Sequence, residues 1–192
     1  PDLKLPGNQN ELLKRFVETG KPVIVILLSG SSIDLCYADE QASAILQAWY
    51  PGARGGRAVS DILFGKTSPS GKLPITFYRN SEDLGDFEDY NMKGKTYRFV
   101  ENEDNVLYPF GFGLTYGKTK VKSAELKKDG ENLIVKAIVE NLGEHEIEDV
   151  VQVYIQSTEP LEKSNPKLCG FKRVKIKDKK EKKILGKKKK LK

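Results

Sequence analysis

The sequence has very few of the residues from which metal sites and nucleophilic triads are built. Its 192 residues contain one histidine and two cysteines. The histidine, His145, lies between Glu144 and Glu146 in a predicted turn, so neither a Ser-His-Asp triad nor a zinc site has the partners that it needs. We therefore expect His145 to be a surface residue, and we expect no metal and no cofactor.

The two cysteines, Cys36 and Cys169, are too few and too far apart for a disulfide framework. We expect both to be reduced thiols in or near the core, which favours a cytoplasmic location. Long hydrophobic runs are also absent, since none approaches the ~20 residues that cross a membrane. The chain starts at Pro1 without an initiator methionine, which indicates that it begins inside a longer polypeptide.

The net charge of +6 comes from one end of the chain. Residues 175–192 contain eleven lysines against Asp178 and Glu181, so the rest of the chain is mildly acidic. Lysines can bind nucleic acid by neutralising phosphates, but this stretch has no aromatic residue to stack on bases and no arginine. We interpret it as a largely disordered tail, ordered only near Val174 and Ile176, and keep a basic-tailed nucleic-acid binder as the least favoured alternative.

The first half of the chain alternates helical and strand patterns. An amphipathic helix is predicted over residues 8–20, and 23–28 is an apolar, β-branched strand that we expect to be buried on both faces. A second strand is predicted at 44–49, followed by a glycine-rich loop, a helix at 58–65 and a short edge strand at 73–77. This order is typical of a doubly wound α/β sheet.

The second half has only strand patterns. We interpret the polar stretch 78–105 as a long connection whose aromatic residues pack against the α/β body. Three alternating runs follow, at 121–127, 133–140 and 150–156, with hairpin-like turns at 128–130 and 141–143. We predict part of an α/β sandwich over residues 1–117. Residues 118–192 are predicted to form an immunoglobulin- or fibronectin III-like β-sandwich, incomplete because such a fold needs about seven strands.

Six segments in order resemble the C-terminal region of glycoside hydrolase family 3. They are LPGNQNELL from Leu5, KPVIVILLSG from Lys21, WYPG to SPSGKLPITF over 49–77, KTYRF from Lys95, YPFGFGLTY from Tyr108 and CGFKRV from Cys169. The resemblance implies a retaining, exo-acting β-glycosidase for β-glucosides or β-xylosides. It also implies a nucleophilic Asp on an N-terminal (β/α)8 barrel missing from this chain, and in many members an acid/base Glu just upstream of LPGNQ. We therefore expect no catalytic residue here.

The substrate-binding candidates lie where two strands end. Ligands of open α/β sheets bind beyond the carboxyl ends of the strands, which here are loops 29–34 and 50–54. Ser31, Tyr50 and Arg54 could bind a β-linked sugar there, because hydroxyl and guanidinium groups pair with sugar hydroxyls and aromatic rings stack on sugar rings.

Two alternative interpretations remain beside the sugar-binding one. Trp49 and Tyr50 could be core residues with Arg54 an ordinary surface charge, and the carboxylates of 82–89 are expected to form a solvated loop rather than a catalytic pair. The chain as a whole could also be a stand-alone carbohydrate-binding or protein-interaction module, since a fold does not fix a function.

Overall fold

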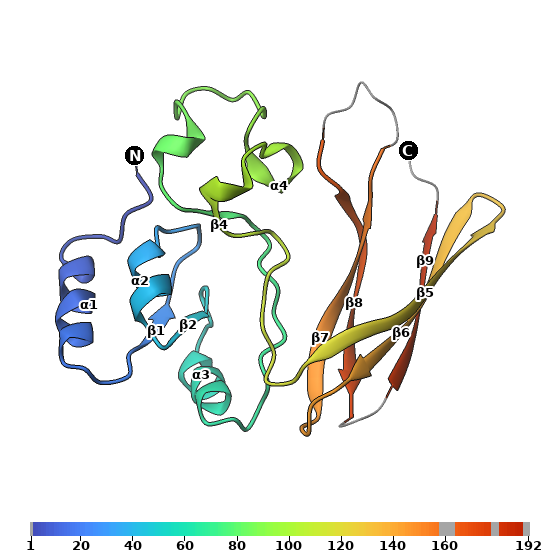
Figure 1. The fold of residues 1–192 in the computed structure, drawn as a ribbon, viewed down its shortest axis with the longest axis horizontal. Helices are drawn as coiled ribbons and strands as arrows, with labels where there is room; N and C mark the ends of the chain where they lie inside the picture. The colour runs from blue at the N-terminus through green and yellow to red at the C-terminus, as the bar shows by residue number, and fades with distance from the viewer. Residues whose placement is uncertain (1, 158–163, 178–180, 190–192) are drawn as a thin grey trace. The chain divides into compact units, whose positions relative to one another are not determined.

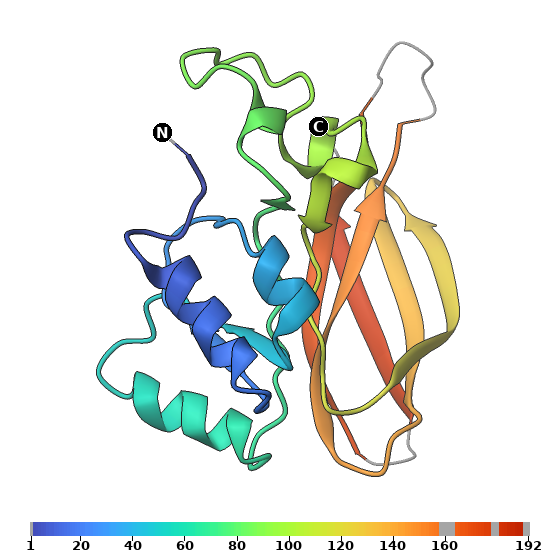
Figure 2. The ribbon, with the colours of Figure 1, turned by 60° about the vertical axis from the view of Figure 1, so that its left-hand side comes forward.

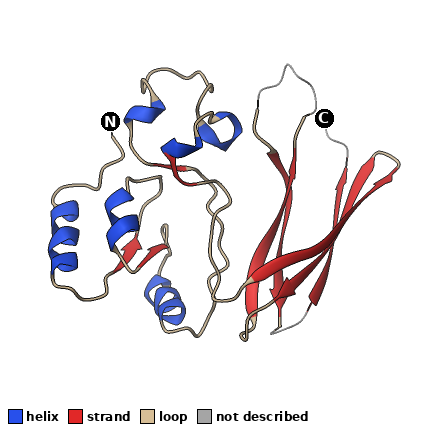
Figure 3. Ribbon diagram, in the orientation of Figure 1, coloured by secondary structure: helices blue, strands red, loops and turns tan. Residues whose placement is uncertain are grey.

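The computed structural model describes residues 2–157, 164–177 and 181–189. The chain divides into two compact units, one formed by residues 1–60 and 73–110 and the other by 61–72 and 111–192. All helices precede residue 106 and all long strands follow residue 118, as Figure 3 shows by colour. Within the described ranges, no helix has the length and hydropathy needed to cross a membrane.

The first unit is a small α/β arrangement (Figure 1). Strands β1 and β2 pair in parallel, and β3 and β4 pair antiparallel. The elements in chain order, of which α3 continues into the second unit, are α1 Gln9–Glu18, β1 Ile24–Leu27, α2 Cys36–Gln41, β2 Ala44–Gln47, α3 Gly55–Leu63, β3 Phe77–Tyr78, η1 Glu82–Leu84, α4 Thr96–Phe99, η2 Glu103–Asn105 and β4 Val106–Tyr108.

One face of the β1–β2 sheet carries the core of this unit. Leu27 of β1 packs with Leu13 of α1 and with Ala38 of α2, and Figure 2 shows both helices in front of the sheet. Phe77 and Leu107 bring β3 and β4 into the same buried cluster. The helices therefore cover the sheet from one side.

The opposite face of β1 is exposed, so the expectation of a strand buried on both faces is wrong. Ile24, Ile26 and Leu28 are 49%, 41% and 61% exposed. Their apolar, β-branched sequence is that of a covered strand, but the described part of the chain supplies helices to one face only. An apolar face and a strand edge are left without a covering layer.

This uncovered face predicts self-association. An open edge strand with apolar side chains is a template for pairing with another copy. We expect the apparent mass of the isolated chain, measured by light scattering, to rise with concentration, and Ile26→Glu to suppress that rise. Ser43→Glu adds the same charge at an exposed polar position and serves as the control. A wild-type chain that stays monomeric at all concentrations would contradict the prediction.

Most element ends match the sequence expectation. Gly20 and Gly65 lie two residues beyond the last residues of α1 and α3, with φ of +69° and +71°, as expected for left-handed helix ends. The edge strand expected at 73–77 is misplaced, because only Phe77 and Tyr78 form β3. The preceding Leu73 and Ile75 pack against the core as irregular chain, where Pro74 lacks the N–H that a ladder needs.

The second unit consists of two antiparallel sheets. Its strands are β5 Thr119–Asp129, β6 Asn132–Asn141, β7 Ile147–Ile155, β8 Lys167–Ile176 and β9 Glu181–Lys189. One sheet has the order β5-β6-β9 and the other is β7-β8. Val139, Val174, Ile176 and Ile184 form a buried cluster between the two sheets.

The lysine-rich end is not disordered where the structure describes it. Strand β9 pairs with β6 over its whole length, and Ile184 lies opposite Ala137 with only 6% of its surface exposed. The prediction of a disordered tail is therefore wrong for residues 181–189, because one buried isoleucine and a full ladder of backbone hydrogen bonds hold the strand. The expectation for 178–180 and 190–192 lies outside the described residues.

The turn at 141–143 is not a hairpin either. Strands β6 and β7 belong to different sheets, so this turn carries the chain from one sheet to the other. Asn141 is fully buried there, its Nδ2 donates to the carbonyl of His145 at 2.8 Å, and its Oδ1 accepts from the N–H of Gly143 at 2.9 Å. The side chain of His145 is exposed, as predicted.

Candidate functional site

The candidate site lies at the carboxyl ends of β1 and β2. The strands are parallel and in register, with Ile24 opposite Ala44 and Leu27 opposite Gln47, so both chains leave the sheet at the same edge. Loop 28–34 follows β1 and the turn before α3 follows β2. The topology therefore juxtaposes the two loops that carry the predicted sugar-binding residues, at the position where open α/β sheets bind ligands.

A side-chain clamp fixes the first of these loops. Gln47 at the end of β2 donates from Nε2 to the carbonyl of Ser29 at 3.1 Å and to its hydroxyl at 3.3 Å. The hydroxyl of Ser29 in turn donates to the carbonyl of Ser31 at 3.0 Å. Ser31 is thus held in an exposed loop by a network that starts on the neighbouring strand. The sequence did not predict this role of Gln47, because a single glutamine in a strand belongs to no motif.

Tyr50 reaches across to this loop. A Cβ built on Gly30 would lie 2.8 Å from Cε2 and 3.0 Å from the hydroxyl oxygen of Tyr50, so the ring rests on the glycine backbone. The side chain is nevertheless 79% exposed, which rules out the core alternative for Tyr50. The ring therefore contacts Gly30, the residue before Ser31, and presents an open surface on which a sugar could stack.

The backbone at Trp49 is strained. Its φ is +53°, in the left-handed region that a bulky non-glycine residue adopts at a cost of about 1–3 kcal/mol. The indole packs against the core of the first unit, while the next residue, Tyr50, projects outward. The reversal at Trp49 therefore separates a core side chain from a rim side chain. Sequence reasoning gave no indication of this conformation.

Two buried oxygens at this edge have no partner. Among the described residues, the side chains with a buried, unpaired polar atom are Ser32, Gln47 and Thr76. The hydroxyl of Ser32 and the Oε1 of Gln47 belong to the site loop and to the strand end beside it. Each unpaired buried group costs about 1–3 kcal/mol.

Arg54 begins the next helix. Its carbonyl accepts the N–H of Ala58 at 3.1 Å, and its side chain is exposed. A Cβ on the following Gly55 would lie 2.5 Å from Cγ of Pro51, so the glycine allows the loop to pack closely on the helix. Arg54 is near Tyr50 in the chain, but unlike Ser31 it is not linked to the ring by a shared contact partner.

In the acidic stretch 82–89, the carboxylates of Asp86 and Asp89 bind backbone N–H groups rather than each other. Asp86 accepts the N–H of Glu88 at 2.9 Å, and Asp89 accepts the N–H of Asn91 at 2.9 Å. Both carboxylates stabilise local turns on an exposed loop. The described ranges also hold no group of three or more His, Cys, Asp or Glu side chains that could bind a metal ion.

A second polar cluster lies at α2. The hydroxyl of Tyr108 donates to Oδ1 of Asp39, and burial, followed by this hydrogen bond, raises the pKa of Tyr108 well above its usual range. Burial and the neighbouring Asp34 raise the pKa of the Cys36 thiol, whose sulfur contacts the carbonyl of Arg79 at 3.2 Å. Protonated Cys36 and Tyr108 are structural groups rather than nucleophiles.

The raised pKa of Tyr108 predicts that the fold loses stability at alkaline pH. Because its pKa is higher in the folded state than the unfolded value of about 10, the folded state holds the proton more tightly, and this stabilisation is lost as the pH rises through the folded pKa. We expect the free energy of unfolding to fall above about pH 10, and Tyr108→Phe to make that fall shallower in urea titrations. Tyr50→Phe, at an exposed ring, is the control. An unchanged slope in Tyr108→Phe would contradict this role.

Comparison with known proteins identifies the family to which the chain is similar. Residues 1–116 match the family model of the glycosyl hydrolase family 3 C-terminal domain. Over 180 residues the chain is 43% identical to a xylan 1,4-beta-xylosidase of Xylanibacter ruminicola, covering 91% of this chain and 20% of that protein. It is 32% identical to a periplasmic beta-glucosidase of Salmonella typhimurium, covering 92% of this chain and 25% of the relative.

Solved structures give the same result. A β-glucosidase from Erythrobacter marinus superposes with a TM-score of 0.83 at 32% identity, over 98% of this chain and 26% of that one. A beta-glucosidase from Kluyveromyces marxianus gives a TM-score of 0.88 at 25% identity, over 98% of this chain and 24% of that one. The chain thus spans about a fifth to a quarter of the length of the relatives that it matches.

Proposed function

The chain belongs to glycoside hydrolase family 3 through its match to the C-terminal domain of that family, and from this premise we propose that it is the C-terminal part of a retaining, exo-acting β-glycosidase. The proposed substrates are β-glucosides or β-xylosides. The observation that carries the proposal is the 43% identity to a xylan 1,4-beta-xylosidase over 91% of the chain. The catalytic carboxylates are proposed to lie in other domains, with the nucleophile on a (β/α)8 barrel.

We propose a matching domain division. Residues 1–117 would be the C-terminal part of a doubly wound α/β sandwich, and 118–192 a fibronectin type III-like module. The parallel β1–β2 pair with helices on one face supports the first assignment, and the two facing antiparallel sheets support the second. The exposed face of β1 supports the presence of a further layer in the parent enzyme.

The role proposed for this chain is to complete the sugar site from the rim. Ser31 and Tyr50 would contact a sugar at the carboxyl edge of the sheet, with Arg54 as a further polar group. The exposed ring of Tyr50 and its contact with Gly30 support this role, because a rigid, open aromatic face is suited to stacking on a sugar ring.

A hybrid enzyme tests the proposal. The matched C-terminal region of the Xylanibacter ruminicola xylosidase would be replaced by this chain, and hydrolysis of p-nitrophenyl β-xyloside and β-glucoside would be measured. We expect clear turnover by the hybrid and none by the same enzyme truncated before that region. A folded hybrid with no activity on either substrate would count against the proposal and in favour of a stand-alone module.

Tyr50 gives a sharper prediction in the same hybrid. Tyr50→Ala is expected to raise KM about tenfold with little change in kcat, because stacking contributes to substrate and transition state alike. Tyr50→Phe keeps the ring and should stay close to the unmodified hybrid. The exposed Phe64→Ala, outside the two site loops, is the control. If Tyr50→Ala leaves KM unchanged, Tyr50 does not contact the substrate.

A further inference from the structure

A small polar pocket lies between α1 and α2 in the first unit, where the two helices run side by side in both ribbon views (Figure 1 and Figure 2). Its volume is about 280 Å3. The residues that bring polar or apolar groups to its wall are Leu5, Asn10, Lys14, Asp34, Cys36 and Tyr37. Because drug-sized ligands occupy pockets of about 300–1,000 Å3, this pocket suits a smaller molecule.

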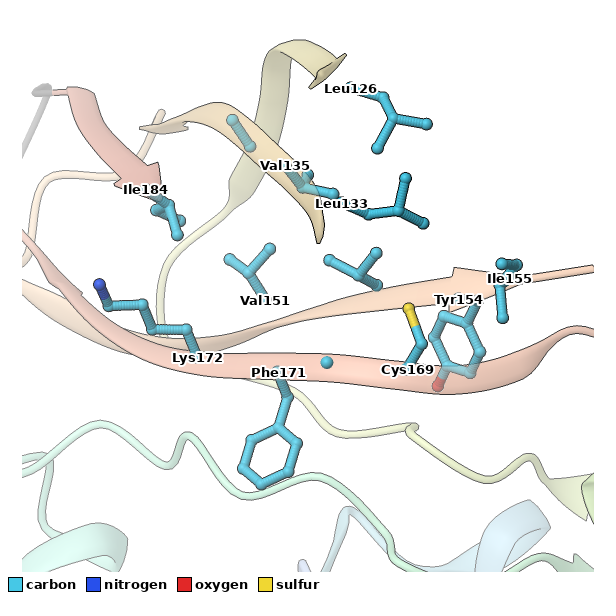
Figure 4. Close-up of a pocket in the computed structure, with 13 residues that line it drawn as sticks. Leu126, Leu133, Val135, Val151, Tyr154, Ile155, Cys169, Phe171, Lys172 and Ile184 are labelled. Carbon is cyan, nitrogen blue, oxygen red and sulfur yellow. The ribbon is translucent and has the colours of Figure 1, made fainter. Parts of the chain in front are cut away.

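The chemistry of this pocket differs from that of the larger cleft in the second unit. That cleft is lined mainly by apolar side chains, among them Leu133, Val135 and Val151 (Figure 4). The pocket beside α1 instead combines the buried Leu35 and Ala38 with two charged groups and an amide. Sites for small molecules typically combine an apolar wall with a few polar groups that orient the ligand.

Lys14 brings a positive charge to the pocket. Its ammonium group lies 5.7 Å from the ring centroid of Tyr37, which also lines the pocket, so the charged end of the side chain is at the site. On the same helix Arg15 pairs with Glu11 at 3.3 Å, whereas Lys14 has no carboxylate partner in the part of the chain that the structure describes. Asn10 lies one turn before Lys14, on the same side of α1. An ammonium group and an amide are donors suited to a carboxylate.

Asp34 brings a negative charge from the loop before α2. Its N–H donates to the carbonyl of Leu3 at 2.7 Å, and its Oδ1 accepts the N–H of Cys36 at 3.0 Å, so hydrogen bonds fix this residue. Burial raises the pKa of the Cys36 thiol, which therefore adds no second negative charge. Lys14 and Asp34 line one pocket, but within the described residues no ion pair joins them. The pocket thus holds two opposite charges apart.

Two separated opposite charges are complementary to a zwitterion. The carboxylate of a free α-amino acid would pair with Lys14 and Asn10, and its ammonium group would pair with Asp34. Such charge-assisted hydrogen bonds are roughly twice as strong as those between neutral groups. A neutral sugar could bond to the same side chains, but it would give neither charge a counter-charge. The charges of the pocket therefore favour the amino acid.

We propose that this pocket binds a free α-amino acid with an apolar side chain. Lys14 and Asn10 bind its carboxylate, Asp34 binds its ammonium group, and Leu5 contacts its side chain. The site lies within the first unit and does not depend on the proposed glycosidase role.

Saturation-transfer NMR on the full chain tests the proposal, with leucine as the probe and a low protein concentration. Two comparison ligands each lack one charge: isocaproate has no ammonium group, and isoamylamine has no carboxylate. We expect leucine to bind saturably and both comparison ligands to bind at least tenfold more weakly, because each leaves one charge of the pocket without a partner. Glucose and xylose are expected not to displace leucine.

Substitutions locate the binding in the pocket. Lys14→Met removes the charge but keeps an apolar stem beside the ring of Tyr37, and Asp34→Asn keeps an oxygen that can accept the N–H of Cys36. Each is expected to weaken leucine binding at least tenfold. Lys21→Met, at an exposed lysine outside the pocket, is the matched control and should bind leucine like the unmodified chain. Thermal unfolding shows whether each variant is folded, and Lys14→Met changes an exposed side chain that the fold does not need.

Four results would contradict the assignment. Equal affinity for isocaproate or isoamylamine would show that one charge suffices and that no zwitterion is recognised. Displacement of leucine by glucose or xylose would assign the pocket to a neutral sugar. An equal loss of binding in Lys21→Met would show general electrostatic attraction rather than a site. Absence of saturable leucine binding to the folded chain would show that the pocket takes no such ligand.

Discussion

The isolated chain is expected to show no hydrolysis of aryl β-glucosides or β-xylosides above the buffer rate. Retaining hydrolysis needs two carboxyl groups about 5–5.5 Å apart, one as nucleophile and the other as acid/base. The carboxylates described above have other partners: Asp86 and Asp89 cap turns, and Asp39 accepts the hydroxyl of Tyr108. Loss of both catalytic groups removes the whole enzymatic rate enhancement, so the expected effect spans many orders of magnitude.

The assay compares the purified chain with buffer and with a family 3 β-glucosidase on p-nitrophenyl β-glucoside and β-xyloside. Asp39→Asn is the informative variant, since Asp39 is the carboxylate that accepts the hydroxyl of the half-buried Tyr108. Turnover by the wild-type chain that disappears in Asp39→Asn would place catalysis within this chain and overturn the account. Turnover that survives the substitution and varies between preparations would point to a contaminating glycosidase.

Asp149→Ala is expected to destabilise the second unit by about 3–5 kcal/mol, which is the cost of breaking a buried ion pair by removing one partner. Lys72 Nζ lies 2.8 Å from Oδ1 of Asp149, with side chains only 17% and 11% exposed. Oδ2 accepts the hydroxyl of Thr119 at 2.8 Å, and Lys72 also donates to the carbonyl of Gly113 at 2.6 Å. Without Asp149 the largely buried ammonium group of Lys72 would have no counter-charge and would keep only the carbonyl of Gly113 as a partner.

Urea denaturation measures this effect, with a matched pair as control. Arg173 and Glu148 form an exposed ion pair at 3.7 Å in the same unit, and Glu148→Ala should cost less than about 1 kcal/mol. Replacing Lys72 and Asp149 together by Met and Leu should cost less than Asp149→Ala alone, because no buried charge is left behind. Equal losses of unfolding free energy in Asp149→Ala and Glu148→Ala would show that the Lys72–Asp149 pair stabilises the unit no more than an exposed ion pair does.

Local patterns predicted the helices α1 and α3 and the strands β1, β2, β5, β6 and β7, because each of these is encoded by its own residues. The apolar positions of 8–20 repeat with helical spacing, and the glycines at 20 and 65 take the left-handed conformation that ends a helix. The alternating runs after residue 118 likewise became β5, β6 and β7. These features depend on neighbours in sequence, which is the information that periodicity contains.

Features that depend on distant partners were missed. Strand β9 looks like a solvated lysine tail until Ile184 is placed against Ala137 of β6. Asn141 looks like a hairpin turn residue until its side chain is seen to bond His145 where the chain changes sheets. The exposed face of β1 was also missed, because its apolar residues predict a strand buried on both faces. The described residues supply helices to only one of these faces.

The candidate site shows the same division. Ser31, Tyr50 and Arg54 follow from the rule that ligands bind where parallel strands end. The clamp from Gln47 and the positive φ of Trp49 do not, because one is a contact across two strands and the other a backbone angle. Both determine how Tyr50 and Ser31 are presented, and neither leaves a mark in the sequence.

The central claim is that this chain is the C-terminal part of a larger β-glycosidase, and sequencing the DNA immediately upstream of the Pro1 codon tests it most directly. The account predicts an uninterrupted reading frame that encodes a (β/α)8 barrel with a candidate nucleophilic aspartate. A ribosome-binding site and a start codon directly before Pro1, with no barrel in frame, would contradict it and identify the chain as an independent module.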